Sequence, residues 1–338
     1  MSPVDNKKVE IEDEEIKNYY DFKCLSIDKN NLESKQVRDL LHECIDKCDY
    51  VAVDCEFLAS RFHSFKKRPT KELYEENLEM WRSASLLQLG LTFFKYEKDE
   101  KSPENLKLIS NSFSLIVIPE HDENGDATWA VEVSCMVFMY EHNFDFKNYF
   151  KNAIPYLPCP QEPSSKNEKS HEFTVKSIFN LLHEKQKTFV VHRGFSDLLF
   201  IYSCFVDRLP STYEEFKKSA HKFYNRIFDT KLLTLDIENN SLGKVYKVLS
   251  EEHSSKVAIS SLVENSTTDS ELKPHDAAYD SFMTAVVFAL KVSYSSENFK
   301  LEEYENIIRA TNGEMYVCLK EESDVCSDKY WDNLDQFK

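Results

Sequence analysis

Short strand-type runs alternate along this chain with longer stretches of helical periodicity, and this alternation limits the fold more than any other feature. The runs 50–57, 83–96 and 113–119 are rich in aliphatic and aromatic residues, as strands are. A polar stretch joins the second run to the third, which favours an antiparallel pair. The later run 188–192 lies between helical patterns. Strands that are adjacent early and separated by helices later predict an α/β fold with a sheet of mixed direction.

Helices are predicted where apolar residues recur every three or four positions. The segment 32–48 has this period, with Val37, Leu40, Leu41, Cys44, Ile45 and Cys48 on one face, whereas 277–293 is predicted as a strongly apolar helix. The predicted helices cover 32–48, 133–150, 175–185, 196–205, 213–223 and 277–293.

The length of 338 residues is enough for one large domain or two small ones. We expect a flexible N-terminus over 1–17, one domain over 18–295 and a C-terminal appendage over 296–338. The polar segment 236–274 is the best candidate for a variable insertion within that domain. No run approaches the roughly 20 apolar residues of a membrane span, so no membrane association is expected.

Composition excludes several kinds of enzyme. The five glycines are too dispersed for a phosphate-binding loop, a dinucleotide-binding turn or a nucleophile elbow. The net charge of −17 argues against a broad basic face for duplex DNA. It leaves open an enzyme that brings one nucleic-acid strand to a metal site, because bound ions supply local positive charge.

The nine cysteines are scattered and form no C-x-x-C pair. With no apparent signal peptide, they predict reduced thiols in a nuclear or cytoplasmic protein. Cys44 and Cys48 lie one helical turn apart, a spacing that suits a metal ligand pair. An apolar helix face explains them better than such a pair.

Two acids interrupt the strand-type run "YVAVDCEF". Asp54 and Glu56 are two residues apart, so both side chains point to one face of a strand, and Cys55 points to the other. Two like charges side by side need a cation, and carboxylate oxygens suit Mg²⁺ or Mn²⁺. On this motif alone, a solvated edge strand with two ordinary acids is an equally good explanation.

Three more residues extend this pair. Asp197 follows the strand-type run 188–192, and Asp280 is an acid in an otherwise apolar helix, where an unpaired charge is costly. His275 precedes Asp280 by five residues. Four acids and a histidine are the groups that a two-metal phosphodiester site uses, with the histidine taking the proton from the attacking water. Each of the three also has an ordinary surface explanation when taken alone.

An ordered set of motifs resembles one known family, the PARN and CCR-associated deadenylases. These motifs are "VAVDCEF", "SLLQLGLTFFK", "NAIPYLP", "FVVHRGFSDLLFIYSCFVDRLPSTYEEF", "RIFDTKLL" and "HDAAYDSFMTAVVF". They are similar to the DEDDh exonuclease pattern and imply a ribonuclease H-like mixed β-sheet flanked by helices. The resemblance covers roughly residues 20–293, and the part around 188–230 is most similar to the nuclear target-of-early-growth-response branch.

The resemblance implies a role for each matched position. Asp54, Glu56, Asp197 and Asp280 would bind two Mg²⁺ ions, with Mn²⁺ as an alternative. His275 would be the general base. Asp229, in "FDTK", also matches a family position, and we interpret it as a structural acid rather than a direct ligand.

Substrate contacts are predicted less specifically. Phe57 is a candidate to stack on the terminal base, although core packing explains it equally well. Arg193 stands where the family often has asparagine, and is a candidate phosphate contact or a surface cation. Ala278 replaces a family glycine without affecting a predicted ligand. The basic stretch 65–68 fits a solvated loop better than a nuclear signal.

The resemblance implies a metal-dependent 3′→5′ exoribonuclease. It would shorten adenosine-rich or other short tails of single-stranded RNA and release nucleoside 5′-monophosphates, in mRNA deadenylation or small-RNA 3′-end processing. A catalytically silent RNA-binding adaptor and a DNA 3′→5′ exonuclease on the same fold are the alternatives. The zinc finger and accessory RNA-binding domains of some relatives have no counterpart, so RNA specificity is expected to come from a homodimer or a protein partner, or from the cleft alone.

Overall fold

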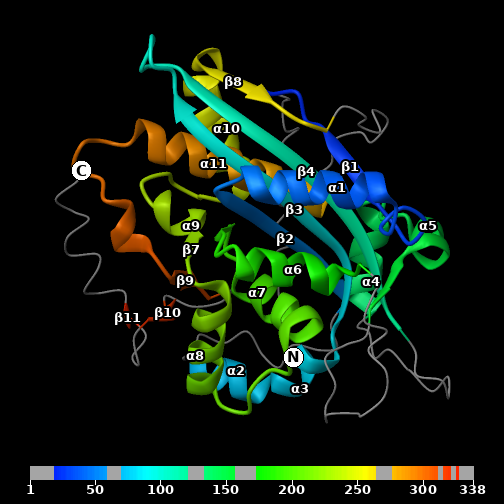
Figure 1. The fold of residues 1–338 in the computed structure, drawn as a ribbon. Helices are drawn as coiled ribbons and strands as arrows, with labels where there is room; N and C mark the ends of the chain where they lie inside the picture. Colours follow the sequence, from blue (N-terminus) through cyan, green and yellow to red (C-terminus); the bar gives the residue numbers. More distant parts are fainter. Residues whose placement is uncertain are drawn as a thin grey trace, which may run out of the picture.

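A mixed β-sheet runs through the molecule, with helices on both faces (Figure 1). In this computed structural model, the residues described are 19–58, 70–120, 133–156, 173–263, 276–310, 315–320 and 325–326. The strands of the main sheet are β1 (Cys24–Ile27), β2 (Tyr50–Leu58), β3 (Ser85–Lys98), β4 (Leu106–Pro119), β5 (Ile154–Tyr156), β6 (Thr188–Val191), β7 (Ile227–Asp229) and β8 (Val257–Ser260).

The strand order is β1-β4-β3-β2-β6-β7, and β5 and β8 also pair with β4. β2, β3 and β4 form an antiparallel meander, whereas β6 and β7 run parallel to β2. The predicted α/β sheet of mixed direction is therefore confirmed, including the antiparallel pairing of β3 with β4. β4 begins at Leu106 rather than at the predicted residue 113, because the polar residues preceding it still pair with β3.

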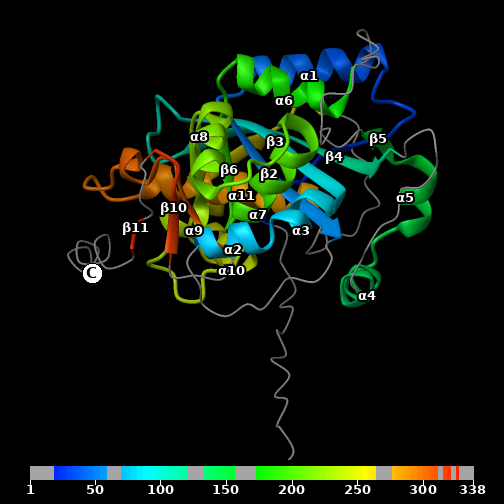
Figure 2. The same ribbon diagram turned by 90° about the horizontal axis from the view of Figure 1, so that it is seen from below.

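Helices cover both faces of this sheet. α1 and α6 lie on one face and α10 and α11 on the other (Figure 2). The helices of the described chain are α1 (Lys35–Lys47), α2 (Thr70–Glu76), α3 (Leu78–Ser83), α4 (Val133–Glu141), α5 (Phe146–Asn152), α6 (Val175–Glu184), α7 (Phe195–Ile201), α8 (Tyr213–Tyr224), α9 (Thr230–Leu233), α10 (Leu242–His253) and α11 (Ala277–Tyr294).

Alternation along β2 divides its side chains between two cores. Val51, Val53 and Cys55 lie in the cluster that also contains residues of α1, α6 and α7. Ala52 lies in the cluster formed with α10 and α11. Because successive side chains of a strand point to opposite faces, Asp54 and Glu56 share the α11 face. Cys55 is buried, as the sequence predicted.

α11 approaches the sheet unusually closely at its first residue. A Cβ added at Gly90 on β3 would lie 1.8 Å from the carbonyl oxygen of Ala277. Only glycine allows this contact, since real Cβ atoms never come so near to a backbone oxygen. The contact places the start of α11, and therefore Asp280 in its first turn, over β2 and β3.

Two predicted helices differ from the observed ones. The helix predicted over 133–150 is two helices, α4 and α5, separated by a turn in which Asn143 adopts φ 59°. Asparagine tolerates this left-handed conformation, and no glycine or proline marks the break. The helix predicted over 196–205 is α7 followed by a π-helical turn, Tyr202–Val206.

Two segments outside the main motifs pack against the sheet. The polar segment 236–274 includes α10, which packs on α11, and β8, which pairs with β4. The segment after α11 forms a small sheet of β9 (Ile307–Arg309), β10 (Met315–Cys318) and β11 (Val325–Cys326), with β9 beside β7. The division into a domain with an insertion and an appendage stays a prediction.

Cys44 and Cys48 are free thiols, and both are buried in the α1 side of the core. This confirms the apolar helix face predicted for the pair. Within the described residues, no helix is both long enough and apolar enough to cross a bilayer.

Candidate active site

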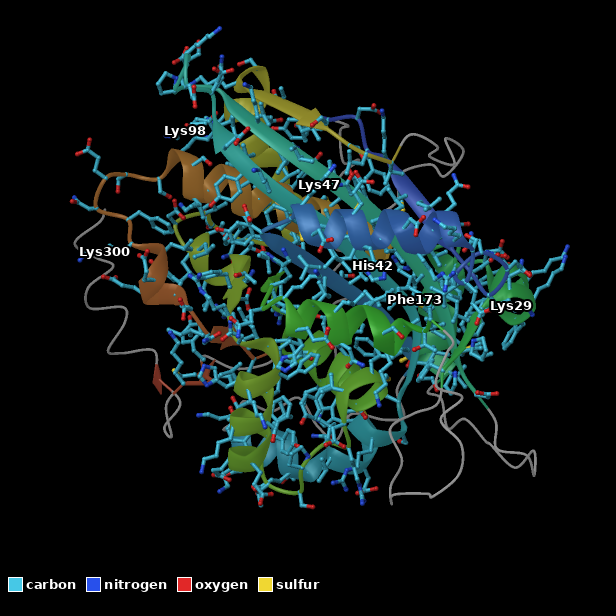
Figure 3. All side chains as sticks on the ribbon, in the orientation of Figure 1. Lys29, His42, Lys47, Lys98, Phe173 and Lys300 are labelled. Carbon is cyan, nitrogen blue, oxygen red and sulfur yellow. The ribbon has the colours of Figure 1, made fainter. Side chains whose placement is uncertain are left out.

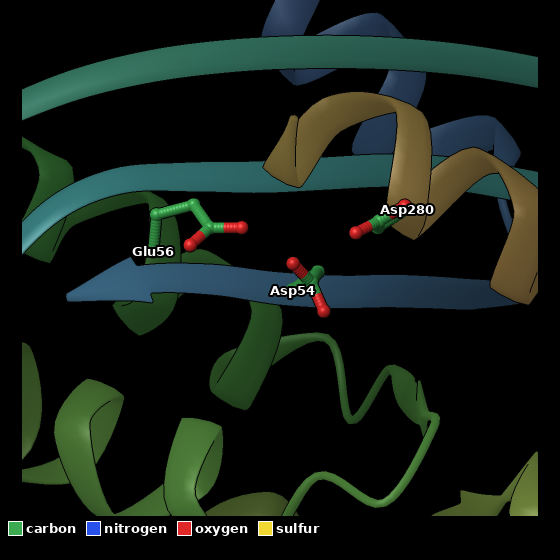
Figure 4. A group of neighbouring side chains, drawn as sticks. All are labelled: Asp54, Glu56 and Asp280. Carbon is green, nitrogen blue, oxygen red and sulfur yellow. The ribbon is translucent and has the colours of Figure 1, made fainter. Parts of the chain in front are cut away.

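Three of the predicted metal ligands converge where α11 begins. Asp54 and Glu56 project from β2 toward Asp280 on the first turn of α11 (Figure 4). One carboxylate oxygen from each side chain lies within 4.8 Å of those of the other two. The three side chains are half-buried, so a solvated ion has access to them.

The pairing of β2 with β3 is irregular beside Glu56. The pairing of β2 with β3 shifts between Glu56 and Phe57, so that Glu56 lies opposite Gln88 and Phe57 opposite Leu86. Leu87 has no partner on β2, so the bulge lies on β3, and bulges are common beside active sites. β6 pairs with β2 only as far as Ala52, which leaves the edge of β2 around Asp54 and Cys55 open to α7.

The acids at this site raise one another's pKa. Burial, followed by the charge of Asp276, raises the pKa of Asp54 to about 7. Burial and the charges of neighbouring acids, Asp54 first among them, raise the pKa of Glu56 well above its usual range. Neighbouring carboxylates that resist ionisation in this way need a cation to hold them charged at neutral pH.

Asp197 approaches the same acids from α7. Burial and the charge of Asp54 raise the pKa of its carboxyl, and the backbone amide of Cys55 acts in the opposite direction. Asp197 is therefore a neighbour of Asp54, but it is outside the three-residue set whose oxygens lie within 4.8 Å of one another. Its role as a ligand stays a prediction.

A fifth acid, Asp276, was missed by the sequence reasoning. Its Oδ1 accepts the backbone N–H groups of Ala278 and Tyr279 at 3.0 and 3.1 Å, and so caps α11. Its Oδ2 accepts the side-chain amide of Gln88 at 3.0 Å, and the same amide nitrogen donates to Ser114 at 2.9 Å. An aspartate directly before an apolar helical run is an N-cap signal that the sequence does carry.

Asp229 has the structural role that the sequence predicted. It is fully buried, and its carboxylate accepts the backbone N–H groups of Arg193 at 2.8 Å, Lys231 at 2.9 Å and Arg309 at 2.9 Å. The hydrogen bond to Arg193 holds that residue at φ 61°, in the turn that leads into α7. Asp229 therefore fixes the start of the helix that carries Asp197.

The remaining predicted site residues are less constrained. The Phe57 ring packs against Phe200, with ring centroids 4.1 Å apart, and the Arg193 side chain is exposed. Base stacking by Phe57 and phosphate contact by Arg193 stay predictions. His275 and the basic stretch 65–68 lie outside the described residues.

The donor set fits a hard divalent cation. All the converging atoms are carboxylate oxygens, which suit Mg²⁺ and Mn²⁺ and are poor partners for softer metals. The raised pKa values of Asp54 and Glu56 show the charge imbalance that such an ion would offset. Asp54, Glu56 and Asp280 are the residues that would hold it.

Comparison with protein families decides the relationship. The family model described as CAF1 family ribonuclease matches residues 27–174 and 161–288. The chain belongs to the CAF1 family of ribonucleases. The predicted PARN and CCR-associated deadenylase family is thereby confirmed, while placement in its nuclear branch stays a prediction.

Individual relatives of this CAF1-family chain carry related names. Poly(A)-specific ribonuclease PNLDC1 of Mus musculus is 22% identical over an alignment of 380 residues, gaps included. The alignment covers 78% of this chain and 70% of that protein. Poly(A)-specific ribonuclease PARN of Arabidopsis thaliana is 30% identical over 147 residues, 37% of this chain and 21% of that protein. The pre-piRNA 3′-exonuclease trimmer of Bombyx mori is 27% identical over 123 residues, covering 33% and 23% of the two chains.

Solved structures agree on the fold. The S. pombe Pop2p structure in its Mg²⁺- and Mn²⁺-bound form superposes with a TM-score of 0.53 at 15% identity. The match covers 85% of this chain and 99% of Pop2p. Yeast CAF1, crystallised with the NOT1 MIF4G domain, gives a TM-score of 0.51 at 14% identity over 84% and 96% of the two chains. The predicted ribonuclease H-like architecture is confirmed.

Proposed function

We propose that this CAF1-family protein is a divalent-metal-dependent 3′→5′ exoribonuclease that removes nucleotides stepwise from single-stranded RNA and releases nucleoside 5′-monophosphates. The observation that carries the proposal is the convergence of Asp54, Glu56 and Asp280 within 4.8 Å in a chain of this family. Bringing three acids together costs free energy, which a bound divalent cation would offset.

The chain's own residues would hold the metal and the attacking water. Asp54, Glu56 and Asp280 would bind divalent ions, with Asp197 beside Asp54 as a fourth ligand and two ions in all. When bound, such ions lower the pKa of a water and stabilise negative charge on the phosphate and on the departing 3′-oxygen. His275, one residue before the N-cap of α11, would accept the proton of that water.

The proposed substrates are RNA 3′ ends that carry adenosine-rich or other short tails. Relatives named poly(A)-specific ribonuclease and pre-piRNA 3′-exonuclease trimmer support both a deadenylation and a small-RNA trimming role. The NOT1 complex of yeast CAF1 supports a protein partner that contributes RNA specificity. A homodimer and a nuclear or cytoplasmic location stay predictions.

The test is a turnover assay on RNA labelled at its 5′ end and bearing an oligo(A) tail. With Mg²⁺ we expect a ladder of stepwise shorter products and release of adenosine 5′-monophosphate. EDTA should abolish the ladder, and Asp54→Ala should slow it by about 10³-fold or more. Intact RNA across several tail sequences and both Mg²⁺ and Mn²⁺ would rule the activity out. A strand with a deoxyribose 3′ end, run in parallel, tests whether the 2′-hydroxyl is required.

A further inference from the structure

The side of β3 that faces α11 carries polar side chains within an otherwise apolar core. Gln88 and Thr92 flank Gly90 on this side, because alternate residues of a strand point to one face. Gln88 is 6% exposed, and Thr92 is fully buried. A polar group in such a place costs free energy unless it is hydrogen-bonded, so the partners of these two residues indicate what they stabilise.

The Gln88 side chain connects the sheet to the start of α11. Its amide nitrogen donates to the Ser114 hydroxyl of β4 at 2.9 Å and to Asp276 Oδ2 at 3.0 Å. These bonds use both protons of the amide nitrogen. The other carboxylate oxygen of Asp276 caps α11, and its backbone carbonyl accepts the N–H of Asp280 at 2.9 Å. Gln88 therefore holds a residue that is itself hydrogen-bonded to Asp280.

Thr92 makes a second connection, to the residue that follows Asp280. The Thr92 hydroxyl lies 2.8 Å from that of Ser281 and 2.9 Å from that of Ser112 on β4. Ser281 donates its own proton to the carbonyl of Ala278, so it accepts the proton of Thr92. The Ser112 hydroxyl then donates to Thr92. These three fully buried hydroxyls form a chain from β4 through β3 to α11.

These polar positions of β3 lie beside the candidate active site. Gln88 is the cross-strand partner of Glu56, and Gly90 is that of Asp54. Charged side chains are placed differently, since the lysines labelled in Figure 3 are exposed at the periphery: Lys29, Lys47, Lys98 and Lys300. Lys98 is the last residue of β3, so the same strand ends in solvent and carries buried polar groups next to the carboxylates.

Hydrogen bonds constrain α11 in a way that apolar packing does not. Apolar contacts are non-directional, so they hold a helix against a sheet without fixing its position along or around its own axis. Hydrogen bonds weaken steeply when their angle departs from linear. One connection before Asp280 in the chain and one directly after it therefore fix the place of that residue over the sheet.

We propose that Gln88 and Thr92 are positioning residues for the metal site. They act through Asp276 and Ser281 and hold the first turn of α11 in one register. In this register a carboxylate oxygen of Asp280 lies within 4.8 Å of those of the two acids on β2. The role rests on the exoribonuclease function proposed above, and it needs no contact of either side chain with metal or RNA. Misplacing a catalytic group by about 1 Å can slow a reaction about 100-fold.

Thr92→Val tests the connection to Ser281, because valine has nearly the same shape and no hydroxyl. We expect the Kd for Mn²⁺, measured by isothermal titration at a temperature at which each variant is folded, to rise about 3- to 10-fold. Thr92→Ser keeps the hydroxyl and should bind Mn²⁺ like the wild type. Thr284→Val is the matched control and should leave the Kd unchanged. Thr284 is similarly buried on α11, and its hydroxyl has no hydrogen-bond partner among the described residues.

Gln88→Met removes the connection to Asp276 and keeps a side chain of similar length. We expect the Kd for Mn²⁺ to rise by about the same factor as in Thr92→Val. On oligo(A), kcat should fall about 10- to 100-fold with KM within about twofold of the wild type. Without metal, the backbone amides of Ala278 and Tyr279 should exchange hydrogen for deuterium faster, because Asp276 then caps them less firmly.

A second control separates lost register from lost stability. Asn306→Ala removes the hydrogen bonds that this side chain makes beside β7, so it should lower stability without changing the Kd for Mn²⁺. The proposal is wrong if Thr92→Val and Gln88→Met bind Mn²⁺ like the wild type, or if Asn306→Ala weakens binding as much as they do. Unchanged amide exchange in Gln88→Met would also overturn it. A wild type that neither binds Mn²⁺ nor shortens RNA would instead refute the proposed function.

Discussion

At the scale of single residues, the site consists of neighbouring carboxylates that repel one another when ionised, unless a cation offsets their charge. Asp54 shows this most clearly, because burial and Asp276 raise its pKa from 3.8 to about 7. The unfolded chain releases this proton near pH 4 and the folded protein only near pH 7. In the absence of metal, the free energy of unfolding should therefore fall as pH rises through this window.

Asp54→Asn tests this expectation directly. The amide has no proton to release, so the variant's stability should depend less steeply on pH between about 4 and 7. Urea unfolding in EDTA at a series of pH values provides the measurement. At pH values above 7, Mg²⁺ should raise the midpoint temperature of unfolding of the wild type and have little effect on that of the variant. Equal pH slopes for the two proteins would contradict the raised pKa.

Asp276 combines two roles that substitution can separate. Asp276→Ala removes the N-cap of α11 and should cost about 1 kcal/mol in unfolding free energy. Asp276→Asn keeps an accepting oxygen for the cap, so it should retain most of that stability while removing a charge next to Asp54 and Glu56. Chemical denaturation of both variants measures their unfolding free energies, of which Asp276→Ala should have the lower. Equal values would mean that the cap is not what stabilises the helix.

The residue chemistry was largely predictable from the sequence, and its limits have physical causes. Asp54 and Glu56 stand out because a strand places alternate residues on one face, and Asp280 because an apolar helix rarely carries an acid. Asp276 does not stand out, since an aspartate before a helix is the expected capping residue whether or not a metal lies nearby. Its second contact, to Gln88, joins positions 188 residues apart, which no local pattern reveals.

At the scale of elements, the geometry of the site depends on how closely α11 approaches β3. Gly90→Ala would place a methyl group 1.8 Å from the Ala277 carbonyl oxygen, so the start of α11 must move away from the sheet. We expect a loss of about 1–3 kcal/mol in unfolding free energy and weaker binding of Mn²⁺, because Asp280 would move with the helix.

Urea unfolding and isothermal titration with Mn²⁺ measure the two effects. Gly243→Ala, in the first turn of α10, is the matched control, since alanine is favoured over glycine in a helix. That variant should be at least as stable as the wild type and bind Mn²⁺ equally well. If Gly90→Ala binds Mn²⁺ normally, the close approach does not position Asp280.

Predicted elements also show where sequence patterns lose information. Periodicity identified α1, α6 and α8 because each buries one apolar face, and α11 was identified by its long apolar run. The sequence pattern did not predict the break between α4 and α5. Asn143 adopts a left-handed conformation there, without the glycine or proline that usually marks such a turn.

At the scale of the whole molecule, the segment after α11 completes the sheet edge. Asn306 donates its backbone N–H to the carbonyl of Ile227 at 2.8 Å and accepts the Ile227 N–H on its side chain at 2.8 Å. Its side-chain amide also donates to the carbonyl of Asn225 at 2.9 Å. These contacts continue the hydrogen bonding of β7, and their long range explains why the sequence suggested an appendage.

Asn306→Ala should therefore destabilise the domain by about 1–3 kcal/mol, because it leaves the buried Ile227 N–H unpaired. A chain that ends at Ser295 should lose more, since Asp229 then also loses the Arg309 N–H. Thermal and urea unfolding of both proteins provide the measurement. If the shortened chain is as stable as the full one, the segment is an independent appendage.

Cys55 is buried between Asp54 and Glu56, so the reactivity of its thiol can report on opening of the site. Burial first, and the surrounding acids next, raise the pKa of this thiol far above its ordinary range, so alkylating reagents meet an unreactive, inaccessible sulfur. Labelling must then wait until β2 separates from α7. The rate of Cys55 labelling would thus report how often β2 separates from α7. A slower rate with Mg²⁺ would show that the metal stabilises the closed arrangement.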